Sequence, residues 1–163
     1  MAAHLAQQRL KEERSHWKKN HPHGFVAKPS VRKDGSMDLM KWDCLIPGKA
    51  DTIWEGGRYP VTLEFSTNYP NKAPVARFPQ GFFHLNVYPD GHVCLSILND
   101  DPDLAGEWKP SISIPQILLG IQNLLDEENA QSPAQARAFE VYRTSKAEYN
   151  RLVSIQARKY AAE

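Results

Sequence analysis

Apolar residues near the start of the chain recur at helical spacing. Leu5, Leu10 and Trp17 stand between charged neighbours at nearly this spacing, which is typical of a helix with one apolar face. The pattern predicts a helix over residues 5–19 that ends before His21-Pro22, because proline disfavours helical geometry in the residue before it. The outer face of this helix is basic.

From residue 40 the apolar positions change to a period of two, which is typical of a strand with one buried side. The first run ends at Pro47-Gly48, and its apolar positions are Met40, Trp42, Cys44 and Ile46. Residues 61–66 alternate in the same way, and 25–28 and 75–78 are shorter strand candidates. Short turns join these segments, so we expect an antiparallel meander.

A long segment without a regular period, residues 79–113, follows the expected strands, and such segments are often functional. Ser113 and Gln116 then form a capping-box pattern before a helix that continues to Leu125. Two more helices are predicted, one opened by Ser132-Pro133-Ala134-Gln135 and one marked by Tyr149, Leu152 and Ile155. This order of elements predicts an α+β fold in a single domain spanning residues 1–163.

Composition narrows the class of protein. The chain has 163 residues, 41% of them apolar, which suits one domain that needs no disulfide or metal to fold. No apolar run is long enough to span a bilayer, so we expect no membrane insertion. The two cysteines form no CxxC pair and no signal segment is evident, so we expect an intracellular, reducing compartment.

Charge is distributed unevenly although the net charge is only +1. Residues 1–33 hold eight Lys and Arg but two Glu, whereas residues 90–107 hold five acidic residues and neither Lys nor Arg. The basic end is modest and interrupted, so it indicates either a solvated helix face or a surface for an acidic protein, rather than one for nucleic acid.

Cys94 is the candidate nucleophile. It follows a turn at Pro89-Asp90-Gly91 that can present a thiol near the surface, although a lone cysteine is also commonly a small core residue. Cys44 shares the apolar side of a strand, so we assign it to the core. Zinc binding by Cys94 with His84, Asp90 and His92 is disfavoured because no further Cys or His pair completes four ligands. We expect no metal.

Two further hypotheses about this segment, a cysteine hydrolase and a role for Asn86, stay open. A cysteine hydrolase would need a histidine base, and His92 is the candidate. Asn86 can bond a loop carbonyl or a developing oxyanion. No phosphate-binding glycine motif is found, so we expect no bound nucleotide or other cofactor.

These residues resemble the ubiquitin-conjugating enzyme family, and most closely its SUMO-conjugating branch. The similarity runs nearly end to end and is carried by separated motifs in the same order. They are Ile46-Pro47-Gly48-Lys49, Trp54-Glu55-Gly56-Gly57, Phe83-His84-Leu85-Asn86-Val87-Tyr88-Pro89, Val93-Cys94-Leu95-Ser96-Ile97-Leu98, Gln116-Ile117-Leu118-Leu119-Gly120-Ile121-Gln122 and Pro133-Ala134-Gln135-Ala136. The resemblance implies a four-stranded antiparallel sheet flanked by helices, with Cys94 in a shallow groove.

By this resemblance, a SUMO-activating enzyme uses ATP to activate SUMO, and Cys94 accepts SUMO as a thioester before a substrate lysine takes it as an isopeptide. Asn86 would support the loop or the oxyanion, and Tyr88 would form an apolar wall. Asp90 stands where this branch has serine, and we expect it to compensate in part for the carboxylate that Ser132 lacks, by helping to deprotonate the lysine. The resemblance also assigns residues to substrate binding, namely Arg77, His92, Ser132, Pro133, Ala134 and Gln135, and residues to non-covalent SUMO binding, namely Arg14, Lys18 and His21. Expected partners are SUMO, its activating enzyme, SUMO ligases and substrate proteins with acceptor lysines, in the nucleus and cytoplasm.

The chain departs from the branch at several places. His84-Leu85-Asn86 stands where the family has His-Pro-Asn, so we expect looser loop geometry. Val75, Asp90, His92 and Ser132 differ from the usual residues of the acceptor groove. The longer acidic segment Asn99–Trp108 resembles loops of ubiquitin-conjugating enzymes, which leaves that branch as an alternative. A catalytically idle modifier-binding module and a cysteine hydrolase are the alternatives of other classes.

Overall fold

A four-stranded antiparallel sheet lies at the centre of the computed structural model, which describes residues 2–161. The strands β1 (Val26–Val31), β2 (Met37–Pro47), β3 (Arg58–Glu64) and β4 (Val75–Arg77) lie in the order of the chain. The expected meander is therefore confirmed. Of the domain expected over residues 1–163, residues 1, 162 and 163 lie outside the described part.

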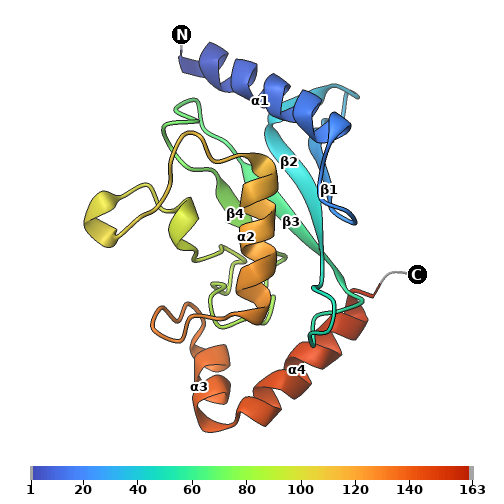
Figure 1. Cartoon of the computed structure of the whole chain (residues 1–163), viewed down its shortest axis with the longest axis vertical. Helices are drawn as coiled ribbons and strands as arrows, with labels where there is room; N and C mark the ends of the chain where they lie inside the picture. The colour runs from blue at the N-terminus through green and yellow to red at the C-terminus, as the bar shows by residue number, and fades with distance from the viewer. Residues whose placement is uncertain (1, 162–163) are drawn as a thin grey trace.

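Alternation along the strands places the core on one face of the sheet. Trp42, Cys44 and Ile46 of β2 are buried, and Trp42 and Cys44 lie opposite Leu63 and Val61 of β3. The helix α2 (Ile114–Asp126) lies across this sheet in Figure 1. Its buried apolar positions follow the helical period and are Ile114, Ile117, Leu118, Ile121, Leu124 and Leu125.

The other helices lie at opposite ends of the molecule (Figure 1): α1 (Ala2–Lys19) at one end, and α3 (Ala136–Thr144) and α4 (Lys146–Lys159) at the other. The buried side of α1 consists of Ala6, Leu10, Glu13 and Trp17. Leu5 is 64% exposed, so its assignment to the apolar face was wrong. One residue step turns a helix by about 100°, which carries Leu5 away from the face that Ala6 buries.

Corrections of the same kind apply to α3 and α4. Ser132 does not cap α3, which begins at Ala136 after Gln135 without a side-chain cap. In α4 the buried positions are Tyr149, Val153 and Ala157, and Ile155 is exposed. Across residues 2–161, no helix combines the length and the apolar content of a membrane span.

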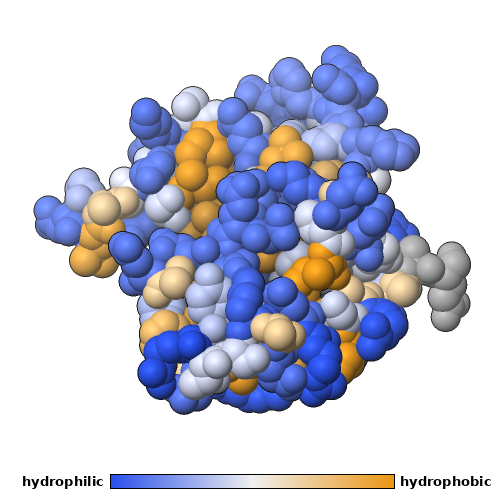
Figure 2. All heavy atoms as spheres, turned by 60° about the horizontal axis from the view of Figure 1, so that its bottom comes forward, coloured by the Kyte–Doolittle hydropathy of each residue, from blue (hydrophilic) through white to orange (hydrophobic). Residues whose placement is uncertain are grey.

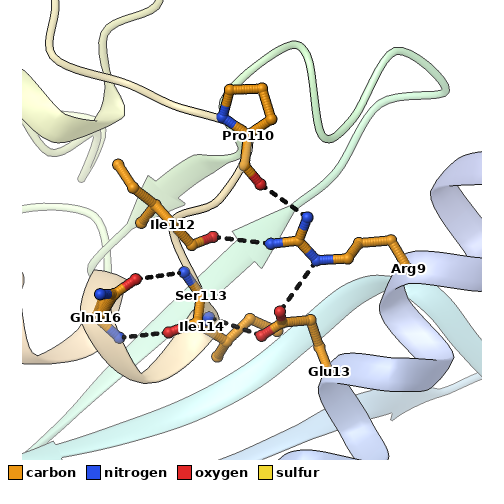
Figure 3. A network of polar contacts seen from close by, with 7 residues as sticks. All are labelled: Arg9, Glu13, Pro110, Ile112, Ser113, Ile114 and Gln116. Carbon is orange, nitrogen blue, oxygen red and sulfur yellow. Dashed lines mark hydrogen bonds and ion pairs between the residues drawn. The ribbon is translucent and has the colours of Figure 1, made fainter.

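A polar network joins α1 to the start of α2 (Figure 3). The Arg9 guanidinium donates to the carbonyls of Pro110 and Ile112 at 2.7 and 3.1 Å and pairs with Glu13 at 3.1 Å. The Glu13 carboxylate accepts the Ile114 N–H at 2.9 Å, at the positive end of the α2 dipole. Beside it, the predicted capping box between Ser113 and Gln116 is present. Both carboxylate oxygens of the buried Glu13 thus have hydrogen-bond partners. Through its bond to Ile114, Glu13 also holds the end of the irregular segment 79–113 against α1.

Candidate active site

Cys94 lies on an extended segment held by backbone hydrogen bonds on both sides. On one side the Cys94 N–H donates to the Asn86 carbonyl at 2.9 Å, and Val87 pairs with Val93. On the other side His92 pairs with Arg77 of β4, and the Val93 N–H donates to the Ala76 carbonyl at 3.0 Å. The position of the Cys94 main chain is therefore set by the sheet edge and by the segment that contains Asn86.

The turn before Cys94 requires glycine at position 91. Gly91 has φ of +98°, and a Cβ atom there would lie 2.0 Å from the Phe78 carbonyl oxygen. The Phe78 N–H also donates to the Gly91 carbonyl at 2.9 Å. This close approach locks the turn against the end of β4.

The two thiols differ in accessibility. Cys94 is half-buried and lines a groove of about 690 Å³, together with residues that include Tyr88, Leu95, Leu124 and Asn129. Cys44 is buried, and desolvation raises its pKa to about 12, so it stays a neutral thiol. The assignment of Cys44 to the core is confirmed, and Cys94 is the thiol that a partner molecule can reach.

Asn86 is fully buried and forms three hydrogen bonds with the loop that borders the groove. Its Nδ2 donates to the carbonyls of Asn129 and Ser132, each at 2.8 Å, and its Oδ1 accepts the Asn129 N–H at 2.8 Å. Both hydrogens of the Asn86 amide are thus donated to loop carbonyls. Of the two roles that the sequence leaves open for Asn86, this geometry supports loop binding rather than stabilisation of an oxyanion. Asn129 and Ser132 both line the groove, so Asn86 sets the position of its wall.

His84 is a neutral, buried residue that holds the same segment. Its Nδ1 accepts the Asn86 N–H at 3.0 Å, so its Nε2 carries the hydrogen that the carbonyls of Leu124 and Leu125 accept. Desolvation lowers the pKa of His84 to about 4. His84 therefore ties the segment to the end of α2 and is unsuited to act as a base toward Cys94.

Leu85 shows how the chain accommodates the loss of the family's proline. The Leu85 N–H donates to the Tyr149 hydroxyl at 3.1 Å, a bond that proline cannot form, and its carbonyl accepts the Ala134 N–H at 2.8 Å. Its side chain is fully buried. The prediction of looser loop geometry at Leu85 is therefore wrong for its backbone, because both its N–H and its carbonyl form hydrogen bonds.

Two of the residues predicted to bind substrate, Ala134 and Gln135, form hydrogen bonds that support the site. The Gln135 amide donates to the carbonyls of Phe82 and Val87, at 2.9 and 3.0 Å, and Ala134 bonds Leu85 as described. Ser132 lines the groove. Pro133 is exposed but does not belong to the groove lining. No sequence pattern points to this supporting role, because Gln135 stands where the sequence predicts the start of a helix.

The other predicted groove residues lie around Tyr88, which is 44% exposed. The rings of Tyr88 and His92 meet edge to face at 5.9 Å, and Asp90 Oδ1 accepts the His92 N–H at 3.0 Å. These residues line a second hollow of about 540 Å³ with Pro89. Arg77 is paired with Glu64 at 3.1 Å, so its charge is partly compensated.

The geometry of the site supports neither metal binding nor a cysteine hydrolase. No three His, Cys, Asp or Glu side chains within residues 2–161 are grouped as metal ligands. A hydrolase requires a thiol–imidazole pair. Across the same residues no hydrogen bond joins Cys94 to a histidine ring, since His84 serves carbonyls and His92 faces Tyr88.

Two of the three basic residues predicted to bind the modifier, Arg14 and Lys18, lie on α1, and His21 follows the end of this helix. Arg14 and Lys18 line a hollow of about 340 Å³, whose apolar part comes from Met37 and Leu39. His21 is not part of this lining. Its Nδ1 donates to the Trp17 carbonyl at 2.7 Å, and its ring stacks on Trp17 at 4.9 Å.

The meander with its flanking helices, and a reachable cysteine in a groove beside the sheet, define a class of enzyme. The family model for ubiquitin-conjugating enzymes matches residues 9–157, so the chain belongs to the ubiquitin-conjugating enzyme family. The expected family and fold are confirmed.

The similar relatives within this family are named as SUMO-conjugating enzymes. The chain is 53% identical to the SUMO-conjugating enzyme SCE1 of Arabidopsis thaliana, over 99% of both chains. It is 51% identical to the enzyme ubc9 of Dictyostelium discoideum, over 97% of both chains. It is 50% identical to UBC9 of Caenorhabditis elegans, over 98% of this chain and 93% of the relative.

Proposed function

We propose that this chain is a SUMO-conjugating enzyme that carries SUMO on Cys94 and passes it to lysines of substrate proteins. The reachable Cys94 thiol in its groove is the observation that supports the reaction. The choice of SUMO rests on the identity of 50 to 53% with enzymes that bear this name.

In the charging step, the sulfur of Cys94 attacks the thioester carbonyl that joins SUMO to its activating enzyme. A carbon–sulfur bond to Cys94 forms, and the bond to the activating enzyme's cysteine breaks, so one thiol is consumed and one released. ATP is spent earlier by the activating enzyme, so this chain needs no nucleotide or metal of its own.

In the transfer step, the neutral amine of a substrate lysine attacks the same carbonyl. A carbon–nitrogen bond forms, the carbon–sulfur bond breaks, and the lysine proton is lost. Lowering a lysine pKa from 10.4 to about 7 corresponds to about 4 to 5 kcal/mol, which desolvation beside Tyr88 and Leu95 would help to supply. The Asp90 carboxylate, exposed beside this wall, would accept the proton.

Asn86 acts in this proposal as a positioning residue. Its hydrogen bonds hold Asn129 and Ser132 where they border the groove. Transfer needs the lysine, the carbonyl and the groove wall in one geometry, and loss of such positioning slows reactions strongly.

The remaining parts of the proposal concern partners. The hollow of Arg14 and Lys18 offers positive charge and an apolar floor for non-covalent contact with SUMO, with His21 nearby in the chain. SUMO ligases and substrate proteins are expected partners, nucleic acid and membranes are not, and the expected location is the nucleus and cytoplasm. A fluorescent fusion of the full chain tests the location.

A paired charging assay tests the function. The chain is incubated with ATP and the SUMO-activating enzyme with SUMO, and separately with the ubiquitin-activating enzyme and ubiquitin. A thiol-reducible adduct is expected with SUMO. An adduct with ubiquitin alone would assign the chain to the ubiquitin branch, to which its longer acidic segment is similar. Absence of any adduct would favour an idle modifier-binding module, and cleavage of conjugates without ATP would favour a hydrolase.

A further inference from the structure

An ion pair joins the loop between α2 and α3, residues 127–135, to the start of α4. The Lys146 Nζ on α4 donates a hydrogen bond to Glu128 Oε1 in this loop. The Glu128 side chain is only 9% exposed, whereas the Lys146 side chain is 49% exposed. Within residues 2–161, Lys146 is the only cation that pairs with this carboxylate. The nearly buried charge of Glu128 therefore depends on Lys146.

Each partner of this pair stands at the less favourable end of a helix dipole. Glu128 follows Glu127, the C-cap of α2, where the end of a helix is partially negative. Lys146 is the first residue of α4, where the end of a helix is partially positive. The two dipoles would favour the opposite charge at each position. Because the charges fit each other but not their own helices, the pair is a local conflict of the kind that is typical of functional positions.

Lys146 also contacts two aromatic rings. Its Nζ lies 4.5 Å from the ring centre of Tyr142 on α3 and 4.9 Å from that of Tyr149 on α4. Tyr149 is buried, and its hydroxyl accepts the Leu85 N–H at 3.1 Å. The ammonium group therefore contacts the tyrosine that holds the segment before Cys94.

The residue after Glu128 belongs to the wall of the groove. Asn129 lines the groove beside Cys94, and its backbone exchanges two hydrogen bonds with the Asn86 side chain. A displacement of Glu128 would move Asn129 with it, because the two residues are consecutive. The ion pair is therefore placed to hold this part of the wall.

We propose that Lys146 and Glu128 are positioning residues for the transfer of SUMO to lysine. This role rests on the proposed function, because it concerns the step in which the lysine enters the groove. One route of contacts runs from Lys146 through Glu128 to the loop that Asn86 binds, and another runs through Tyr149 to Leu85. Loss of the pair loosens the groove wall against the segment before the cysteine, which slows a reaction that requires both in one geometry.

The two partners differ in their access to water. The end of the molecule that carries α3 and α4 comes forward in Figure 2, where its surface is mostly hydrophilic. Water can solvate the half-exposed ammonium of Lys146 when it lacks a partner, but it reaches the Glu128 carboxylate poorly. Removal of the lysine should therefore be more harmful than removal of the charge of Glu128.

The test uses the full chain charged with SUMO and isolated from the activating enzyme. Discharge to a peptide lysine is followed in single turnover at several peptide concentrations. Lys146→Gln should lower the maximal discharge rate about fivefold and Glu128→Gln about twofold. The charging rate and the peptide concentration that gives half the maximal rate should change little. Glu128→Gln/Lys146→Gln should be no slower than Lys146→Gln, because the unpaired carboxylate is then absent.

Exchange of the two charges gives a readout that a general loss of stability would not give. Glu128→Lys/Lys146→Glu keeps an ion pair and places each charge at the end of the helix dipole that favours it. The melting temperature of this variant should equal or exceed that of the unsubstituted chain. Its maximal discharge rate should recover to within about twofold of that of the unsubstituted chain.

Arg151→Gln is the matched control, because it removes a cation of the same helix that pairs with Glu148 and does not line the groove. This variant should keep the discharge rate. Equal losses in Arg151→Gln and Lys146→Gln, equal losses in charging and discharge, or a charge exchange that discharges no faster than Lys146→Gln would each overturn the role. Failure of the unsubstituted chain to accept SUMO would instead overturn the proposed function, so the two failures are distinguishable.

Discussion

Asn86 and Asn129 are joined by a reciprocal pair of hydrogen bonds, in which the Asn86 side chain donates to the carbonyl of Asn129 and accepts from its N–H. Both distances are 2.8 Å, and a third bond reaches Ser132. The Asn86 side chain thus bonds the backbone of the loop between α2 and α3 in the way that a neighbouring strand would. This pairing links the segment before Cys94 to the wall of the groove.

Replacing Asn86 should separate the two steps of the reaction. Asn86→Ala leaves Asn129 and Ser132 without their partner, which should slow transfer to lysine at least tenfold, about 1.4 kcal/mol, while charging of Cys94 changes little. Single-turnover charging and discharge measure the two steps. An equal loss in both would contradict a specific role in transfer.

Asp90 should matter only when a lysine must lose its proton. In Asp90→Asn the acceptor for the His92 N–H is kept and the charge is lost, so transfer near pH 7 should slow by about two- to tenfold, less than for a fully placed base. Glu55→Gln, an exposed substitution outside both hollows, serves as the control. An unchanged discharge rate in Asp90→Asn or Asp90→Ser would remove Asp90 from the catalytic residues.

His84 should make stability depend on pH. Its pKa is lowered to about 4 in the folded chain, so the unfolded chain binds the extra proton between about pH 6.5 and 4. The contribution of His84 is therefore complete above pH 6.5 and is lost as the pH falls toward 4, by about 3 kcal/mol. Urea unfolding across this range measures the slope.

The variant His84→Gln should be less stable at pH 7 and should lose that slope. His23→Gln, which changes an exposed histidine, should keep it. A slope that persists in His84→Gln would assign the pH dependence to other groups.

Gly91→Ala should damage the site more than substitutions at other glycines with positive φ. Gly56 has φ of +93° and nothing within 4 Å of its added Cβ, so Gly56→Ala should cost only the left-handed strain of about 1 to 2 kcal/mol. Gly91→Ala adds a clash with the Phe78 carbonyl, worth about 1 to 3 kcal/mol more. Thermal unfolding compares the two variants, and equal losses would mean that the close approach is unimportant.

The sequence predicted most of the fold because its patterns are local. Alternation from Met40 to Ile46 and the capping box at Ser113 depend only on neighbouring residues, and both are present. The sequence could not show which apolar residue of a helix faces the core, as with Leu5, because helix orientation depends on partners far along the chain.

The site was predicted less completely than the fold, because most of its contacts join residues far apart in the chain. Cys94 stands out by its turn, but the bonds of Asn86, Gln135 and Leu85 join segments 43 to 64 positions apart. Such bonds have no periodic signal. The four carboxylates of residues 99–107 are evident from the sequence. Their position beside the groove is not, because it depends on distant contacts such as the hydrogen bond from the Ala73 N–H to Asp100 Oδ2.

The intact mass of the charged protein tests the central claim most directly. After reaction with SUMO, activating enzyme and ATP, the chain and its Cys44→Ser variant should each gain one SUMO, which a thiol reductant removes. Cys94→Ser should hold SUMO as an oxygen ester that resists the reductant, and Cys94→Ala should gain none. A reducible adduct that survives in Cys94→Ala, or that is lost in Cys44→Ser, would contradict the account.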